Sequence, residues 1–120
     1  MDIEIIIAND ENIREIVKTE IDRLGKYADL NHIDVSNVTN MTRLFANSQF
    51  NGYISRWNVS NVESMKEMFA GSIFDGNISE WDVSNVVNME GMFRNSQFNG
   101  SISKWNICNV KSTKNMFTYS

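Results

Sequence analysis

The chain is 120 residues long, with 42% hydrophobic and 22% charged residues and a formal net charge of −4. This length and composition fit one globular domain, and the single cysteine, Cys108, excludes a disulfide scaffold. The charge balance offers no basic surface for nucleic acid, and no apolar stretch is long enough to cross a bilayer. We therefore expect no nucleic-acid partner and no membrane insertion.

The first 29 residues carry no repeat and predict a βα cap. Ile3–Ala8 predicts a strand, and Asp10 is placed to cap a helix from about Glu11 to Leu24, with Gly25 as its stop. The apolar residues of this helix share one face; they are Ile13, Ile16, Val17, Ile21 and Leu24. We expect that face to cover the first of the repeats that follow, as terminal units of repeat proteins do.

From residue 30 onward the sequence repeats with a period of 24 residues. Trp57, Trp81 and Trp105 keep this spacing, and so do two sets of phenylalanines. The sets are Phe45, Phe69, Phe93 and Phe117, and Phe50, Phe74 and Phe98. A period of this length indicates a solenoid, in which each unit buries its apolar face only against its neighbours.

The first half of each repeat predicts a short strand. In the second repeat Ile54, Trp57 and Val59 have the spacing L-x-x-L-x-L that marks the strand of a leucine-rich repeat. The strand is expected at about Arg56–Val59, with Trp57 and Val59 inward and Arg56 and Asn58 outward.

The second half predicts a short helix, capped by Ser60 and ending near Gly71. Its apolar stripe is Val62, Met65, Met68 and Phe69. The predicted fold class is an α/β repeat, namely a right-handed LRR-like solenoid of four 24-residue strand–helix coils over residues 30–120. Together with the cap at residues 1–29, it forms a single domain.

Most recurring residues are expected to build the core rather than a site. The tryptophans and the methionines lie at inward positions, which favours stacking and core filling over a carbohydrate strip or a soft-metal face. An asparagine also recurs once per repeat and predicts a buried ladder that bonds neighbouring coils. These asparagines are Asn37, Asn61, Asn85 and Asn109.

The segment "FNGYISRWNVSNVESMKEMF", residues 50–69, carries a family resemblance. It resembles the repeat of the BspA-like leucine-rich-repeat surface proteins, which also defines a domain of unknown function in mycoplasma lipoproteins. The resemblance covers roughly Leu30 to Phe117. It implies an LRR-like solenoid, a non-enzymatic role and binding at the bacterial cell surface, and it supplies no catalytic residue.

The outward positions that differ between repeats form the candidate binding strip: Tyr53, Arg56, Glu80 and Lys104. A polar residue also recurs on the predicted open sheet face, where it would either bind a partner or form a turn with its own backbone. These residues are Asp34, Asn58, Asp82 and Asn106. The alternative for these four residues is a charged face that contacts only water.

No cluster of residues predicts chemistry. Cys108 and His32 lie three coils apart, and the carboxylates are scattered, so we expect no enzyme, cofactor or metal site. The last repeat has Thr113 where Met65 and Met89 stand in others, which predicts a weakly capped end able to self-associate.

The predicted function is a non-catalytic repeat module that binds a protein partner. A bacterial surface or secreted adhesin that contacts host ligands, and an intracellular regulatory or immunity-type partner, are the alternatives. The opening residues lack the basic and long apolar segments of a signal peptide, which favours the cytoplasm. The family resemblance favours the cell surface or secretion.

Overall fold

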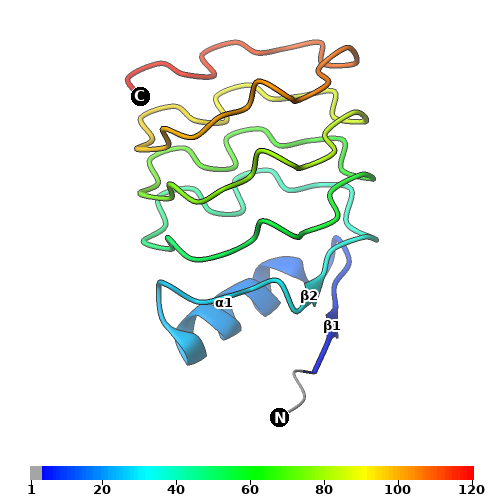
Figure 1. The fold of residues 1–120 in the computed structure, drawn as a ribbon, viewed down its shortest axis with the longest axis vertical. Coiled ribbons are helices and arrows are strands. Elements are labelled where there is room, and N and C mark those ends of the chain that lie inside the picture. Colours follow the sequence, from blue (N-terminus) through cyan, green and yellow to red (C-terminus); the bar gives the residue numbers. More distant parts are fainter. Residues whose placement is uncertain (1–3) are drawn as a thin grey trace.

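One helix and two short strands are the regular elements of the protein, whose computed structural model describes residues 4–120 (Figure 1). β1 spans Ile6–Ile7, α1 spans Ile13–Leu24 and β2 spans Ile33–Asp34. β1 and β2 pair in parallel, with Ile6 opposite Ile33. The whole forms one body of 42 × 25 × 25 Å with a radius of gyration of 13.4 Å.

The prediction of an LRR-like solenoid of four strand–helix coils is wrong. Residues 35–120 contain no helix and no strand of two or more residues, and the sheet consists of β1 and β2 alone among the described residues. The repeats instead consist of turns joined by single parallel bridges between residues 24 apart. The bridges connect Asn40 to Ser64, Ser64 to Asn88, and Asn88 to Ser112.

The predicted helix of each repeat is interrupted by left-handed backbone. Glu67, in the middle of the second repeat's predicted helix, has φ of 52°, and Gly71 has φ of 67°. The N–H groups of Met65, Glu67 and Phe69 do not bond four residues back, as helical groups would. They donate to the carbonyls of residues 88, 90 and 92 in the next repeat, at 2.8–2.9 Å.

The predicted strand is replaced by a tight turn, although its inward and outward pattern is correct. The Trp57 N–H donates back to the Ile54 carbonyl at 3.1 Å, so the backbone folds on itself. Trp57 and Val59 are buried, at 4% and 1% exposure, while Arg56 and Asn58 are exposed. The alternation therefore came from the shape of the turn and not from a pleated strand.

Successive repeats lie one above another along the longest axis (Figure 1). We number them repeat 1 (30–53), repeat 2 (54–77), repeat 3 (78–101) and repeat 4 (102–120). The same backbone hydrogen bonds recur at each junction: Arg43, Glu67 and Gly91 each donate to the carbonyl 23 residues later, at 2.8–2.9 Å. Each repeat is thus ordered by the next.

Columns of aromatic rings fill the centre of the stack. The rings of Trp57, Trp81 and Trp105 are nearly parallel, with centroids 6.5 Å apart at each step. The column through Phe45, Phe69, Phe93 and Phe117 has steps of 5.5–5.7 Å. Each indole N–H donates to a carbonyl of the preceding repeat, as Trp81 does to Ile54 at 3.0 Å. The expected core role of the tryptophans, and of the methionines, is confirmed.

Three of the four asparagines of the predicted ladder bond the neighbouring repeat, but none of the four is buried. The side-chain amides of Asn61, Asn85 and Asn109 donate to the carbonyls of Ser36, Ser60 and Ser84 at 2.7–2.8 Å. All three asparagines are exposed. A hydrogen bond made partly in water contributes less than the buried bond that we expected.

α1 covers the first repeat, as the cap prediction required, but its cap residue differs. The helix ends at Leu24, where Gly25 has φ of 92°, which confirms the predicted stop. At the start, the Asn9 side chain accepts the N–H groups of Glu11 and Asn12 at 2.9 and 3.0 Å, so Asp10 is not the cap. Leu24 is 44% exposed and lies outside the buried face. The predicted strand residue Ile3 lies outside the described residues.

Candidate binding surfaces

All four side chains of the candidate strip are exposed to solvent. Tyr53 is 62% exposed, Arg56 is exposed, and Glu80 and Lys104 form an ion pair of 2.6 Å with side chains 67% and 69% exposed. The structure thus brings Glu80 and Lys104 together across one layer junction. A pair so open to water adds little to stability, which leaves both side chains available to other contacts.

The polar residues predicted on the outer face of a sheet form turns with their own backbone instead. Asp34 accepts the N–H of Ser36 at 2.9 Å and its hydroxyl at 2.6 Å, and Asp82 does the same with Ser84 at 3.0 and 2.6 Å. The side-chain hydrogen bond from the serine, then the backbone one, lowers the pKa of each carboxyl below its usual value.

In the corresponding asparagines the side-chain oxygen accepts a backbone N–H two residues later. Asn58 accepts the N–H of Ser60 at 3.1 Å, and Asn106 accepts that of Cys108 at 3.0 Å. The alternative that these residues make local turns therefore has a direct structural basis. Their remaining polar atoms face water and remain candidates for contact with a partner.

A charged cluster around one buried carboxylate joins α1 to repeat 1. Glu20 is 4% exposed; it accepts two hydrogen bonds from Arg23, at 2.8 and 2.9 Å, and lies 2.6 Å from Nε2 of His32. Hydrogen bonding from Arg23, and then from His32, lowers the pKa of Glu20 from 4.5 to about 2. His32 stands at the position of repeat 1 that Arg56 and Glu80 occupy in the next two repeats, but its side chain is only 10% exposed and does not extend the candidate strip.

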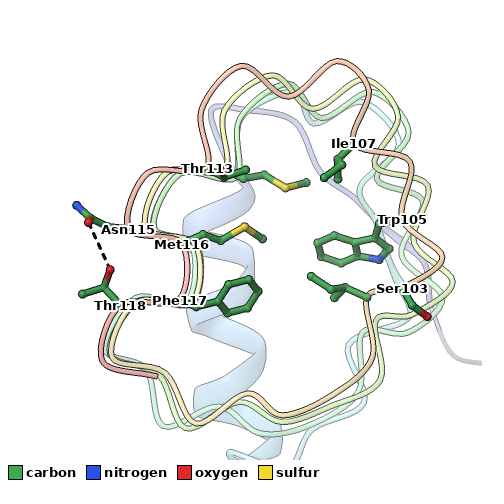
Figure 2. A pocket seen from close by; sticks show the side chains of 10 residues that line it. Ser103, Trp105, Ile107, Thr113, Asn115, Met116, Phe117 and Thr118 are labelled. Carbon is green, nitrogen blue, oxygen red and sulfur yellow. Dashed lines mark hydrogen bonds between the residues drawn. The ribbon is translucent and has the colours of Figure 1, made fainter.

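The face of repeat 4 turned away from repeat 3 is hollow and apolar; we call it the open face. A cavity of about 680 Å³ there is lined by Met89 from the layer below and by side chains of repeat 4. Trp105, Ile107, Met116 and Phe117 point toward its centre (Figure 2). Phe117 and Ile107 are each 50% exposed, whereas Phe69 and Val59 at equivalent positions are 0% and 1% exposed.

Smaller grooves follow the sides of the stack. One of about 460 Å³ is polar and runs along Asn61, Asn85 and Asn109. Another, of about 320 Å³, includes Arg56 beside His32 and lies where β1 meets repeat 1. Within residues 4–120, no group of three or more His, Cys, Asp or Glu side chains is placed to hold a metal ion. No helix in that part of the chain could span a membrane.

The sequence analysis did not predict the buried Glu20 or the cavity beside repeat 4. Glu20 occupies a position on the buried face of α1, at helical spacing from Ile13 and Val17, and a carboxylate there signals a buried ion pair. The cavity of the open face was expected only as a weak cap. Thr113, which is exposed and lines the cavity, is the residue that signalled it.

The repeats also carry the family signature. A family model described as Mycoplasma protein of unknown function, DUF285, matches residues 12–120, which is most of the chain. The chain belongs to this family. The part of the resemblance that concerned a repeat of unknown function in mycoplasmas is therefore confirmed. No curated protein and no solved structure gave a significant match to the chain.

Proposed function

We propose that this DUF285 protein is a non-catalytic module that binds a protein partner through Tyr53, Arg56, Glu80 and Lys104. The observation that carries the proposal is the contrast between fixed and changing positions of the repeat. The same buried residue, tryptophan, recurs in repeats 2, 3 and 4. The exposed residue just before it changes from Arg56 to Glu80 to Lys104.

The strip has the chemistry of a small interface. Tyrosine and arginine are enriched among residues that dominate binding energy, and Tyr53 and Arg56 stand exposed in successive positions of the strip. The Arg56 backbone N–H is held by the Asn31 side chain at 2.8 Å, so the arginine projects from an ordered segment. Order before binding lowers the entropy lost on association.

Site-specific photocrosslinking tests the proposal. A photoreactive amino acid at position 53 or 104 should capture one defined protein in the native cells, and the same group at position 94 should not. Arg94 is an exposed arginine beside Glu67 and Gly71, away from the strip, and neither it nor Arg56 donates a side-chain hydrogen bond within residues 4–120. The pair Arg56→Ala and Arg94→Ala is therefore matched for charge and exposure.

With the photoreactive residue at position 53 or 104, adding Arg56→Ala should abolish capture of the partner. Adding Arg94→Ala should leave the capture unchanged. Equal capture from all three positions would contradict a role for the strip. Both variants should unfold at the same urea concentration as the parent, because neither side chain is part of the core.

We also propose display on the bacterial surface, as in BspA-like proteins. The support is the match to a Mycoplasma family together with the repeat motif of residues 50–69. Protease treatment of intact cells tests this, with an antibody to the chain as readout. Loss of the protein from intact cells supports surface display. Survival until lysis supports the alternative of an intracellular regulatory or immunity-type partner.

A further inference from the structure

The pocket where β1 meets repeat 1 has a set of polar side chains that repeat 2 does not share. Its volume is about 320 Å³, and its lining consists of Ile5, Asp29, Asn31, His32 and Arg56. At the positions of repeat 2 that correspond to residues 29, 31 and 32, the sequence has Tyr53, Ser55 and Arg56. The repeat itself therefore does not explain why these side chains gather here.

Hydrogen bonds hold one wall of this pocket in place. The Asp29 carboxylate accepts the backbone N–H and the side-chain amide of Asn31, both at 2.9 Å. The Asn31 side-chain oxygen in turn accepts the backbone N–H of Arg56 at 2.8 Å. Three lining residues are thus linked before any ligand binds, and a site ordered in advance loses less entropy on binding.

The imidazole of His32 is oriented by a buried carboxylate. Hydrogen bonding lowers the pKa of Glu20 to about 2, so this carboxylate is ionised at neutral pH and Nε2 of His32, 2.6 Å from it, donates the hydrogen bond. The His32 side chain is only 10% exposed. Its Nδ1 makes no hydrogen bond within residues 4–120, and no fully buried side-chain nitrogen or oxygen there lacks a partner. Nδ1 is therefore in contact with solvent, and His32 lines the pocket, so this nitrogen is available to a ligand.

Arg56 supplies a positive charge that no carboxylate neutralises. Its guanidinium forms no ion pair and no side-chain hydrogen bond within residues 4–120. Asp29, the carboxylate of the same pocket, instead uses one oxygen for both hydrogen bonds from Asn31. A guanidinium has five N–H donors and no acceptor, and a carboxylate matches two of these donors in parallel. The chemistry of the pocket therefore favours an anionic oxygen ligand.

We propose that this pocket binds an acidic side chain, Asp or Glu, of the protein partner, with its carboxylate held by Arg56 and by Nδ1 of His32. The inference deepens the function proposed above and rests on it, because Arg56 belongs to the strip. Tyr53 of the strip lies beside the pocket, since it forms a parallel bridge with Asp29. Its ring, 62% exposed, is placed to contact the chain that carries the acidic side chain.

Protonation of His32 is part of this binding mode. A neutral imidazole with its proton on Nε2 presents a lone pair at Nδ1, which repels a carboxylate, whereas the doubly protonated ring donates from both nitrogens. The charged groups around the imidazole are Glu20 and Arg23 from α1, and Asp29 and Arg56 from the repeats. β1 brings the apolar Ile5 to the pocket. Binding of the carboxylate should therefore take up one proton and strengthen as the pH falls.

NMR spectroscopy of the full chain tests the inference, because His32 is the only histidine of the sequence. The probe is the N-acetyl, N-methylamide derivative of glutamate, and the matched control is the same derivative of glutamine, which lacks the charge. The glutamate probe should bind with a millimolar Kd and shift the imidazole nitrogen resonances of His32 toward those of the doubly protonated ring. The glutamine derivative should bind at least about tenfold more weakly. The glutamate probe should also bind more tightly at about pH 5.5 than at about pH 7.5.

Variants of the protein locate the binding. Arg56→Gln should weaken binding of the glutamate probe by at least about tenfold, and it should still fold because the side chain is exposed. Arg94→Gln removes another exposed arginine without a side-chain hydrogen bond, and it should bind the probe like the parent. His32→Gln should remove the pH dependence of binding. If that variant does not fold, Arg56→Gln and the His32 resonances of the parent still decide the matter.

Several results would overturn the inference. They are equal binding of the glutamate and glutamine derivatives, unchanged binding by Arg56→Gln, and unchanged His32 resonances at saturation. Inorganic phosphate, titrated at the same ionic strength, should bind more weakly than the glutamate probe; tighter binding of phosphate would also overturn the inference and favour a phosphorylated ligand.

The inference and the proposed function can fail separately. A partner captured by crosslinking at position 53 or 104, together with no binding of the glutamate probe, would reject the pocket and retain the strip. Binding of the probe without any captured protein would reject the protein partner and retain a pocket for carboxylates. Binding of the probe together with a captured partner, whose capture is lost when an acidic residue of that partner is replaced by its amide, is the expected result.

Discussion

The apolar core is covered at one end of the stack and exposed at the other. At the N-terminal side, α1 lays Ile13 and Val17 over repeat 1, and Phe45 in that layer is 1% exposed. At the open face, Phe117 at the equivalent position is 50% exposed and lines a cavity of about 680 Å³. A layer thus becomes fully buried only when something covers it, either another repeat or a helix.

Polar groups show the same contrast. Side chains of the cap take over the roles of a missing repeat: the Asp10 carboxylate receives the N–H groups of Thr39 and Asn40 at 2.7 and 3.1 Å. In the layer above, the Thr39 carbonyl receives the N–H groups of Glu63 and Ser64, at the equivalent positions. No side chain within residues 4–120 plays this part for the donors of repeat 4. Layers near α1 should therefore be more sensitive to mutation than repeat 4.

The largest effect is expected from removal of a ring in the middle of the stack. Trp81→Ala removes a ring with tryptophan neighbours on both sides and should cost about 3–5 kcal/mol of unfolding free energy. Trp105 has a tryptophan neighbour on one side only, Trp81, and its other side borders an existing cavity. Trp105→Ala should therefore cost less than half as much unfolding free energy as Trp81→Ala. Urea unfolding followed by circular dichroism measures both. Equal losses would contradict the difference between covered and open layers.

A second comparison uses glycines at equivalent positions. A Cβ at position 52 would lie 2.0 Å from the Ala28 carbonyl oxygen, whereas at position 100 the nearest atoms belong to the Phe98 ring, at 2.8 Å. The Phe98 ring is partly exposed and can move, but the backbone beside Gly52 cannot. Gly52→Ala should therefore cost about 3 kcal/mol, and Gly100→Ala about 1 kcal/mol or less. Thermal melts should give the lower midpoint for Gly52→Ala; the reverse order would be inconsistent with a rigid closed end.

The cluster of Glu20, Arg23 and His32 between α1 and repeat 1 predicts a pH dependence. The folded-state pKa of Glu20, about 2, is below its ordinary value of 4.5, so its contribution is complete above pH 4.5 and is lost as the pH falls toward 2. Glu20→Gln should cost about 1.5–3 kcal/mol at pH 7, because charged hydrogen bonds to Arg23 and His32 are replaced. The variant should then lose less stability than the parent between pH 4.5 and 2.

Glu15→Gln, on the exposed side of α1, is the matched control. It should reproduce both the neutral-pH stability and the acid slope of the parent. A parent and a Glu20→Gln variant with the same acid slope would show that other carboxylates, such as Asp10, Asp34 and Asp82, carry the whole acid sensitivity.

The sequence predicts which residues are buried much better than it predicts the backbone. The period of 24 and the inward Trp57 and Val59 follow from apolar spacing alone, and burial confirms them. The helical stripe of Val62, Met65 and Phe69 was misleading, because turns that stack in register bury the same spacing as one helical face. Periodicity reports which side chains share a face; it does not identify the hydrogen-bond partners.

A signal against the helix was present in the sequence. Positions 47, 71 and 95 read Asn, Gly and Asn, and all have positive φ. The other left-handed position is Arg43, Glu67, Gly91 and Asn115 in successive repeats. Asparagine and glycine favour this conformation, and they occupy the first position in repeats 1–3 and the second position in repeats 3 and 4. Their recurrence at these two positions indicates left-handed residues, which no helix accommodates. Single residues such as Glu67 hide the pattern, and only the aligned repeats reveal it.

The smallest effect, and the most specific to the closed end, is expected at Asp10. Its carboxylate accepts from the Thr39 N–H and hydroxyl at 2.7 and 2.6 Å and from the Asn40 N–H at 3.1 Å. Asp10→Ala should cost about 1 kcal/mol, because the site is exposed and water replaces part of the lost bonding. Asp10→Asn keeps one acceptor oxygen and should recover about half of that loss. Native-state hydrogen exchange should show faster exchange at the Thr39 and Asn40 amides in Asp10→Ala, with the amides of Glu63 and Ser64 unchanged. Faster exchange throughout both layers would mean that Asp10 orders the whole junction rather than replacing the carbonyl of a missing repeat.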